Sequence, residues 1–282
     1  MSAPASGAWG LSGCTVRFGR RHRVTALDDV SLAVPRGEVT AVVGGDGAGK
    51  TTLLRALAGR VVPRSGRVDA PGRARIGFMP TTAGVWRDLS VDENAEFVGR
   101  AYRMSGAGLA RRRSELLARA GLLGVGDRLG GHLSGGMRQK LGFCLAMLHG
   151  PDLLILDEPS TGVDPVSRVE LWRMITEVAA QGRAVVMATT YLDEAERAST
   201  VLVLDQGRTL YSGRPDAIAG AVPGAVVAVG EPLGAGVVTW CRGRERRAWC
   251  ATPPDGATVL EPDLEDAVIA LTIARGAVDG DA

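Results

Sequence analysis

Four residues of one glycine-rich segment, residues 44–52, have the types and spacing of a phosphate-binding loop. Gly44, Gly49, Lys50 and Thr51 stand in the order glycine, any four residues, glycine, lysine, threonine. Glycines let the backbone curl around a phosphate, so that successive amide groups point toward it. The lysine adds a full positive charge, and the threonine hydroxyl can be a ligand of Mg²⁺. The segment therefore predicts a triphosphate site.

The elements on either side of this loop support that interpretation. Residues 38–43 form a short apolar run, rich in β-branched residues, that is typical of a buried strand. Leu53, Leu54 and Leu57 have the spacing of one helix face, and Gly59 is placed to end the helix. A helix that starts at the loop adds the positive end of its dipole to the phosphate site. A plain glycine-rich turn is the weaker alternative.

Two acidic residues end a second apolar strand. Residues 153–156 are all apolar, and Asp157 and Glu158 follow directly. An aspartate beside a phosphate loop can hold Mg²⁺ through a water, and the adjacent glutamate can polarise an attacking water. The next residues, 159–165, read Pro-Ser-Thr-Gly-Val-Asp-Pro, an order more specific than the acidic pair. These residues predict hydrolysis of a terminal phosphate.

A third segment, residues 133–140, places small residues at a predicted helix start. Ser134, Gly135 and Gly136 would leave free N–H groups and a helix dipole facing an anion. The alternative is an ordinary helix with Ser134 as its N-cap. The position of the segment, a short way upstream of the acidic pair, favours anion binding.

Composition bounds the class of protein. The chain has 282 residues and a formal net charge of +2, so it has room for a large domain and an appendage but lacks the basic excess of a nucleic-acid binder. No stretch approaches the ~20 apolar residues that span a bilayer, and the N-terminus lacks a signal-peptide pattern. We expect a soluble, cytosolic protein with no nucleic-acid partner and with reduced thiols at Cys14, Cys144, Cys241 and Cys250.

Strands that alternate with helices predict an α/β fold with a largely parallel sheet and a helical insertion. We expect a flexible tail over residues 1–13 and a main domain over residues 14–220, with the helical subdomain at about 88–148. From about residue 221 the sequence pattern changes to short runs of Val and Ala that are interrupted by Gly and Pro. Residues 221–282 therefore predict a small β-rich extension, closed by a helix over residues 264–273.

The chain resembles the ATP-binding subunits of ABC transporters over roughly residues 16–218, with the motifs in the family's order. Residues 44–52 are similar to the Walker A motif, 133–139 to the ABC signature and 153–158 to Walker B with its catalytic glutamate. Residues 160–164 match the D-loop. The resemblance implies a P-loop NTPase fold of ABC type, with a mostly parallel core sheet, an antiparallel β subdomain, a helical signature subdomain and a C-terminal appendage.

The resemblance also assigns roles to residues. Glu158 is the expected catalytic residue, Thr51 and Asp157 are expected to hold Mg²⁺, and Phe18 falls where the family stacks an aromatic on adenine. The signature residues Ser134, Gly135 and Gly136 are expected to act in trans. The expected ATP-binding residues are Phe18, Gly44, Gly45, Asp46, Gly47, Ala48, Gly49, Lys50, Thr51 and Thr52.

The family arrangement implies partners as well. One copy of each motif implies a second nucleotide-binding subunit, either an identical chain or a homologous one. A transmembrane permease subunit would couple ATP hydrolysis to transport, which implies a location on the inner face of the cell membrane. Residues 264–272, which read LEDAVIALT, resemble the tail of the drug-exporter, daunorubicin-resistance-like branch. We therefore expect a subunit that powers an exporter.

Two positions depart from the family pattern. Thr81 stands where the family has a glutamine that senses magnesium and water, and Thr190 stands where it has a switch histidine. Losing one pre-organised transition-state donor typically costs about 3–4 kcal/mol. We therefore expect slow ATP turnover with intact ATP binding. Two alternatives stay open: a weakly hydrolysing regulatory half of a heterodimeric pair, and a soluble ABC ATPase with no transport role.

Overall fold

A computed structural model describes residues 7–19, 24–230 and 237–280. Its centre is a six-stranded sheet in the order β5-β6-β7-β3-β8-β9, in which every pairing is parallel except that of β8 with β9. The strands are β3 (Val39–Val43), β5 (Ile76–Met79), β6 (Leu153–Asp157), β7 (Ala184–Ala188), β8 (Thr200–Asp205) and β9 (Arg208–Gly213). The predicted parallel sheet is confirmed. Asp205, Gln206 and Gly207, which stand between two short apolar runs and so predict a hairpin turn, do join β8 to β9 at the sheet's edge.

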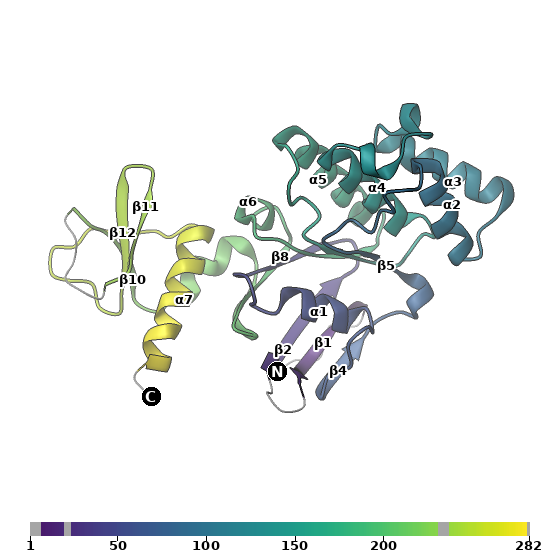
Figure 1. Cartoon of the computed structure of the whole chain (residues 1–282). Helices are drawn as coiled ribbons and strands as arrows, with labels where there is room; N and C mark the ends of the chain where they lie inside the picture. Colours follow the sequence, from purple (N-terminus) through teal and green to yellow (C-terminus); the bar gives the residue numbers. More distant parts are fainter. Residues whose placement is uncertain (1–6, 20–23, 231–236, 281–282) are drawn as a thin grey trace.

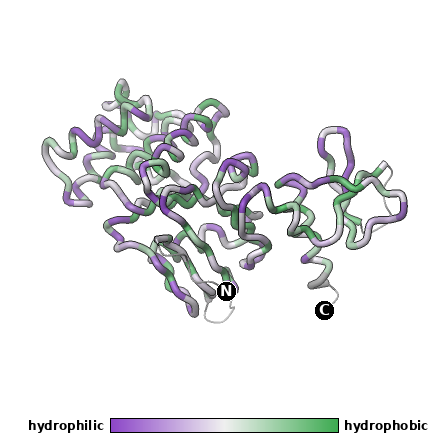
Figure 2. Tube along the Cα trace, turned by 180° about the vertical axis from the view of Figure 1, so that it is seen from behind, coloured by the Kyte–Doolittle hydropathy of each residue, from purple (hydrophilic) through white to green (hydrophobic). Residues whose placement is uncertain are grey.

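This sheet is buried on both faces, which explains its continuous apolar strands. Successive side chains of a strand point to opposite faces. In β6, Leu154 and Leu156 join one core cluster, whereas Leu153 and Ile155 join the other. Figure 2 shows hydrophobic segments through the middle of the sheet and hydrophilic ones toward the outer helices and turns.

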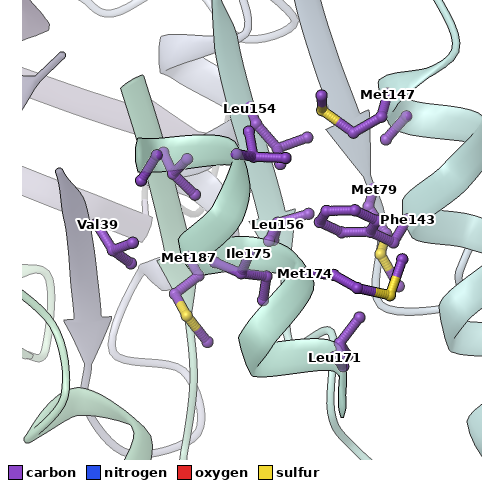
Figure 3. Close-up of a cluster of buried hydrophobic side chains, with 14 of the residues drawn as sticks. Val39, Met79, Phe143, Met147, Leu154, Leu156, Leu171, Met174, Ile175 and Met187 are labelled. Carbon is purple, nitrogen blue, oxygen red and sulfur yellow. The ribbon is translucent and has the colours of Figure 1, made fainter. Parts of the chain in front are cut away.

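Helices cover one face of the sheet (Figure 1). They are α2 (Val91–Ala101), α3 (Gly106–Arg119), α4 (Gly135–Met147) and α5 (Pro165–Ala180). The first three fall inside the predicted insertion at about 88–148. Phe143 of α4 is 2% exposed and belongs to the same core cluster as Met79 and Leu156, which Figure 3 shows in close-up. The buried thiol of Cys144 lies in this cluster too, and burial raises its pKa to about 12.

Replacing Phe143 with alanine is expected to lower the free energy of unfolding by about 3–5 kcal/mol, because it removes a buried ring and leaves a cavity. Urea unfolding followed by circular dichroism measures this change. Val62→Ala is the matched control, since Val62 is 88% exposed; its effect is expected to stay within about 0.5 kcal/mol. Equal losses in the two variants would contradict this account of the core.

Helix α1 (Lys50–Leu57) and a three-stranded antiparallel sheet cover the other face. The sheet has the order β2-β1-β4, with β1 (Ala8–Phe18), β2 (Val24–Pro35) and β4 (Ser65–Asp69). The expected tail over residues 1–13 was wrong from residue 8 onward, because residues 8–11 pair with β2 and 10–12 with β4. The segment is rich in Ala, Gly and Ser, which give no clear alternation of polar and apolar residues, and this hid the strand. Residues 1–6 lie outside the described part of the chain.

The C-terminal region forms a separate four-stranded sheet in the order β11-β12-β10-β13. Its strands are β10 (Ala225–Ala228), β11 (Thr239–Arg242), β12 (Glu245–Cys250) and β13 (Val259–Leu260), and they follow a 3₁₀ helix, η4 (Pro215–Ala221). Helix α7 (Leu264–Gly280) lies between this sheet and the rest of the molecule in Figure 1 and is longer than predicted. Its buried Asp266 accepts hydrogen bonds from Trp240 and Arg247, which fix α7 to the small sheet.

Within the described residues, no helix has the length and apolar character needed to cross a membrane.

Candidate functional site

The glycine loop and the acidic pair meet at one edge of the central sheet. Strand β7 lies between β3 and β6, and its Ala188 is in register with Val42 on one side and Asp157 on the other. All three strands are parallel, so the segments that follow β3 and β6 leave the sheet at the same edge. In open α/β sheets, this carboxyl edge is where ligands bind.

The Walker A loop needs its glycines for close packing. Gly44 and Gly49 have φ values of 155° and 106°, which side chains rarely allow. A Cβ on Gly49 would lie 2.5 Å from the carbonyl oxygen of Ala26, and one on Gly44 would collide with the carbonyl of Leu204. The loop is therefore pressed between β2 and β8. Helix α1 starts directly after Gly49. Because glycine has no side chain that could cap the helix, the first backbone amides of α1 remain available to a ligand.

Lys50 reaches back over the loop. Its side chain is only 6% exposed, and its ammonium group donates hydrogen bonds to the carbonyl oxygens of Gly44 at 2.8 Å and Gly45 at 3.2 Å. It also lies 3.8 Å from a carboxylate oxygen of Glu158. A buried cation whose partners are backbone carbonyls and one carboxylate is suited to bind an anion.

The loop and Glu158 enclose a cavity of about 510 Å³. Of the ten residues predicted to bind ATP, eight line it, whereas Gly44 and Phe18 do not. Phe18 is 46% exposed and pairs with the cavity residue Val24 across β1 and β2. Among the residues that the structure describes, the lining is Val24, Thr25, Ala26, Gly45, Asp46, Gly47, Ala48, Gly49, Lys50, Thr51, Thr52, Glu158 and Gln206.

Asp157 sits where a cation would be stabilised. The hydroxyl of Thr51 donates to its carboxylate at 3.1 Å, and Thr81 also hydrogen-bonds to it. The pKa of Asp157 is raised above its ordinary value, mainly because the carboxyl is buried. The negative charge of the neighbouring Glu158 raises it further, whereas the two hydrogen bonds lower it by less. Hence the bare carboxylate is destabilised, and a cation beside it would offset that cost.

Glu158 is held in an unusual backbone conformation at the cavity wall. Its φ is 52°, in the left-handed region that non-glycine residues seldom occupy. The hydroxyl of Thr161 donates to one carboxylate oxygen at 3.0 Å, and Lys50 lies near the other. Backbone strain of this kind concentrates at functional sites. The geometry leaves Glu158 oriented toward the cavity with a carboxylate able to accept a proton.

The signature segment lies away from this cavity. Ser134 caps α4 by accepting a hydrogen bond from the N–H of Met137 at 3.2 Å. A Cβ on Gly135 would lie 2.7 Å from the carbonyl oxygen of Gly162, and one on Gly136 would lie 2.6 Å from Ser167 Oγ. The signature therefore packs on the D-loop and the start of α5 of its own chain. None of its three small residues is among those lining the cavity described above.

The segment after β7 carries the second threonine substitution. Thr189 is buried, donates to Glu194 at 2.7 Å and accepts from the N–H of Tyr191 at 3.0 Å, whereas Thr190 is exposed and lines no part of the cavity. Arg168 of α5 contacts the same segment. Its guanidinium stacks over Tyr191 at 4.0 Å and lies 3.5 Å from Glu194.

Within the described part of the chain, sequence reasoning missed four residues that line the cavity: Val24, Thr25, Ala26 and Gln206. The first three belong to no recognisable binding motif. Their position beside the cavity depends on how β2 pairs with β1, which the local sequence does not show. Gln206 sits in the predicted hairpin turn between β8 and β9, so the turn signal was available but its position beside the loop was not.

Comparison with known proteins gives consistent matches. The sequence profile of the ABC transporter family matches residues 27–161. The probable multidrug ABC transporter ATP-binding protein YbhF of Escherichia coli (strain K12) is 39% identical over 218 residues, which cover 74% of this chain. The daunorubicin resistance ATP-binding protein DrrA2 of Streptomyces coeruleorubidus is 39% identical over 219 residues, covering 74% of this chain and 67% of that protein.

Solved structures agree with the sequence matches. A structure described as the ATP-binding subunit of an ABC transporter is 29% identical, with a TM-score of 0.67, and the match covers 76% of this chain and 92% of the other. The chain spans 38% of the length of YbhF. The matches and the fold together confirm the resemblance found in the sequence, and the chain belongs to the ABC transporter family, with the fold of its ATP-binding cassette.

Proposed function

We propose that this chain binds and hydrolyses ATP and thereby powers an exporter through a separate membrane subunit. One observation carries the proposal: Lys50, Thr51 and Glu158 converge on one cavity that the glycine loop encloses. Relatives described as a multidrug transporter ATP-binding protein and a daunorubicin resistance ATP-binding protein support export of a lipophilic compound.

Each residue has a role in this reaction. The amides of the loop and the start of α1 bind the phosphates, and Lys50 neutralises their charge. The hydroxyl of Thr51 and the carboxylate of Asp157 would hold Mg²⁺, because hard oxygen ligands beside a destabilised carboxylate fit this ion. Mg²⁺ would supply charge neutralisation on the phosphate oxygens. Glu158 orients the attacking water and accepts its proton.

The functional unit is a pair of cassettes. Ser134, Gly135 and Gly136 present a helix start but do not line the cavity of their own chain. A second cassette that supplies its signature to this cavity would complete the site and would receive this signature in return. The second subunit is an identical chain or a homologue.

An exposed aromatic pair offers a docking surface for the membrane subunit. Trp86 and Phe97 lie edge to face with centroids 4.6 Å apart, 44% and 51% exposed. The buried Asn94 holds the backbone of Trp86 through hydrogen bonds at 2.8 and 3.0 Å. The same loop begins near Thr81, which bonds to Asp157. A partner docked here would place this chain on the inner face of the cell membrane.

Co-expression with the membrane protein encoded beside this chain tests the proposal. We expect the pair to purify together from membranes and to hydrolyse ATP in a Mg²⁺-dependent manner. Phe97→Ser is expected to lower recovery of the membrane subunit about tenfold without changing ATP binding by the isolated chain, since aromatic anchors dominate interfaces. Val62→Ser is the control, because Val62 is 88% exposed and lies outside the pair. An isolated chain that fails to bind ATP would refute the proposed function.

A second candidate is a weakly hydrolysing half of a heterodimeric pair. Thr190 favours it, because an exposed hydroxyl at this position cannot carry a charge to the γ-phosphate. The intact Glu158 at the cavity wall favours the active subunit, which we place first.

A further inference from the structure

The turn that joins β8 to β9 forms part of the cavity wall. Its two central residues, Gln206 and Gly207, have φ values of 45° and 77°. Two positive values are typical of a tight type I′ hairpin, in which asparagine, aspartate or glycine is usual at the first position. A glutamine there carries backbone strain. Gln206 is nevertheless exposed and lines the cavity beside the Walker A loop, and strain at a cavity wall points to a role in binding.

The turn is fixed on two sides. The N–H of Gly207 donates to the carbonyl of Ala48 at 3.0 Å, which ties the turn to the Walker A loop. The carbonyl of Gly207 accepts from the N–H of Asp28 at 2.8 Å, and Arg208 pairs with the Asp28 carboxylate at 2.9 Å. A Cβ on Gly207 would lie 2.7 Å from the carbonyl of Ala26, so the turn also packs closely on β2.

These contacts place the turn at the junction between the Walker A loop and β2. Residues 45–52 form the part of the cavity that suits phosphate, whereas Val24, Thr25 and Ala26 line the part that the loop does not form. Gly207 packs against Ala26, so Gln206 lies where the loop meets this second part. A carboxamide both donates and accepts hydrogen bonds, which suits a ribose hydroxyl or the edge of a base.

Helix α7 holds the turn from outside the main domain. Arg275 donates to the carbonyl oxygen of Asp205 at 2.8 Å, and its guanidinium lies 3.6 Å from the Asp205 carboxylate. Both side chains are mostly buried. Asp205 directly precedes Gln206, and α7 is joined to the small C-terminal sheet through Asp266. A continuous set of contacts thus runs from the C-terminal sheet to the wall of the cavity.

We propose that Gln206 contacts the nucleoside part of ATP and that the C-terminal extension, through Arg275, holds it in position for this contact. The extension therefore raises the affinity of the cavity for nucleotide. The proposal rests on the proposed ATP-binding function and adds a recognition residue and a role for the extension.

Gln206→Gly tests the contact, because glycine suits the turn and removes only the side chain. The dissociation constant for ATP is expected to rise about two- to tenfold, the range of one net hydrogen bond, while that for inorganic tripolyphosphate stays unchanged. Gln181→Gly is the matched control, since Gln181 is exposed at the end of α5. Unchanged ATP affinity, or equal weakening for both ligands, would overturn the proposal.

Arg275→Ala tests the role of the extension in the full-length chain. Like Gln206→Gly, it is expected to weaken the binding of ATP but not that of tripolyphosphate. The double variant should bind ATP no more weakly than Gln206→Gly alone. Arg244→Ala, an exposed arginine in the β11–β12 turn, is the control. Wild-type affinity in Arg275→Ala would refute the coupling. A wild-type chain that binds neither ligand would instead refute the proposed function.

Discussion

Replacing Glu158 with glutamine is expected to lower the rate of ATP hydrolysis at least about a hundredfold and to leave the dissociation constant for ATP within about threefold of wild type. General-base catalysis contributes about 10²–10⁴ to a rate, and an amide cannot accept the proton of the attacking water. The amide oxygen can still accept the hydrogen bond from Thr161, so the local structure should persist. Phosphate release and nucleotide titration measure the two quantities.

The matched control for this variant is Glu177→Gln. Glu177 forms an exposed pair with Arg173 at 3.8 Å on α5, away from the cavity. Because exposed pairs contribute little, its rate and affinity should equal those of the wild type. If Glu158→Gln retained the wild-type rate, another group would have to activate the water.

Wild-type ATP turnover is expected to be slow, and introducing histidine at Thr190 is expected to raise its rate by about a hundredfold, the value of one pre-organised transition-state donor. Thr190 is exposed and stands two residues after the end of β7, so a larger side chain fits without repacking the core. The neighbouring Thr189 keeps its bonds to Glu194 and Tyr191, which hold the segment in place. Steady-state turnover should be measured with and without the membrane subunit.

Two companion variants sharpen this test. Thr209→His places the same side chain on exposed β9 and should leave the rate unchanged. Thr81→Gln restores the other family residue, beside Asp157, and should add to the gain. A rapid wild-type rate that neither restored residue increases would refute the idea that the two threonines slow turnover.

Local pattern was sufficient to predict the chemistry of this chain. The loop at 44–52 was recognisable because glycine, lysine and threonine at this fixed spacing together form a site for phosphate and Mg²⁺. The acidic pair was placed correctly because β6 is apolar on both faces, which is typical of a central parallel strand. Asp164 followed by Pro165 predicts an N-cap and a first helical residue, and in the structure the carboxylate of Asp164 accepts from the N–H of Ser167 at 3.0 Å.

Contacts between distant segments could not be predicted in the same way. The first part of β1 was missed because small residues there give no clear alternation, and its pairing with both β2 and β4 supplies the stability. Gln206 reaches the cavity only because β8 lies beside β3 in the sheet, an order that no local pattern encodes. The bond between Arg275 and Asp205 spans 70 residues for the same reason.

Strand β7 separates the two halves of the site, since it lies between β3 and β6 with Ala188 in register with both. The distance between the bases of those halves is two strand spacings, about 10 Å, and is set by main-chain bonds. Side chains beyond the strand ends can therefore change during evolution without altering the scaffold that carries them. Thr81 and Thr190 both lie beyond the ends of β5 and β7, so either can be exchanged for another side chain while the spacing between the two halves of the site stays fixed.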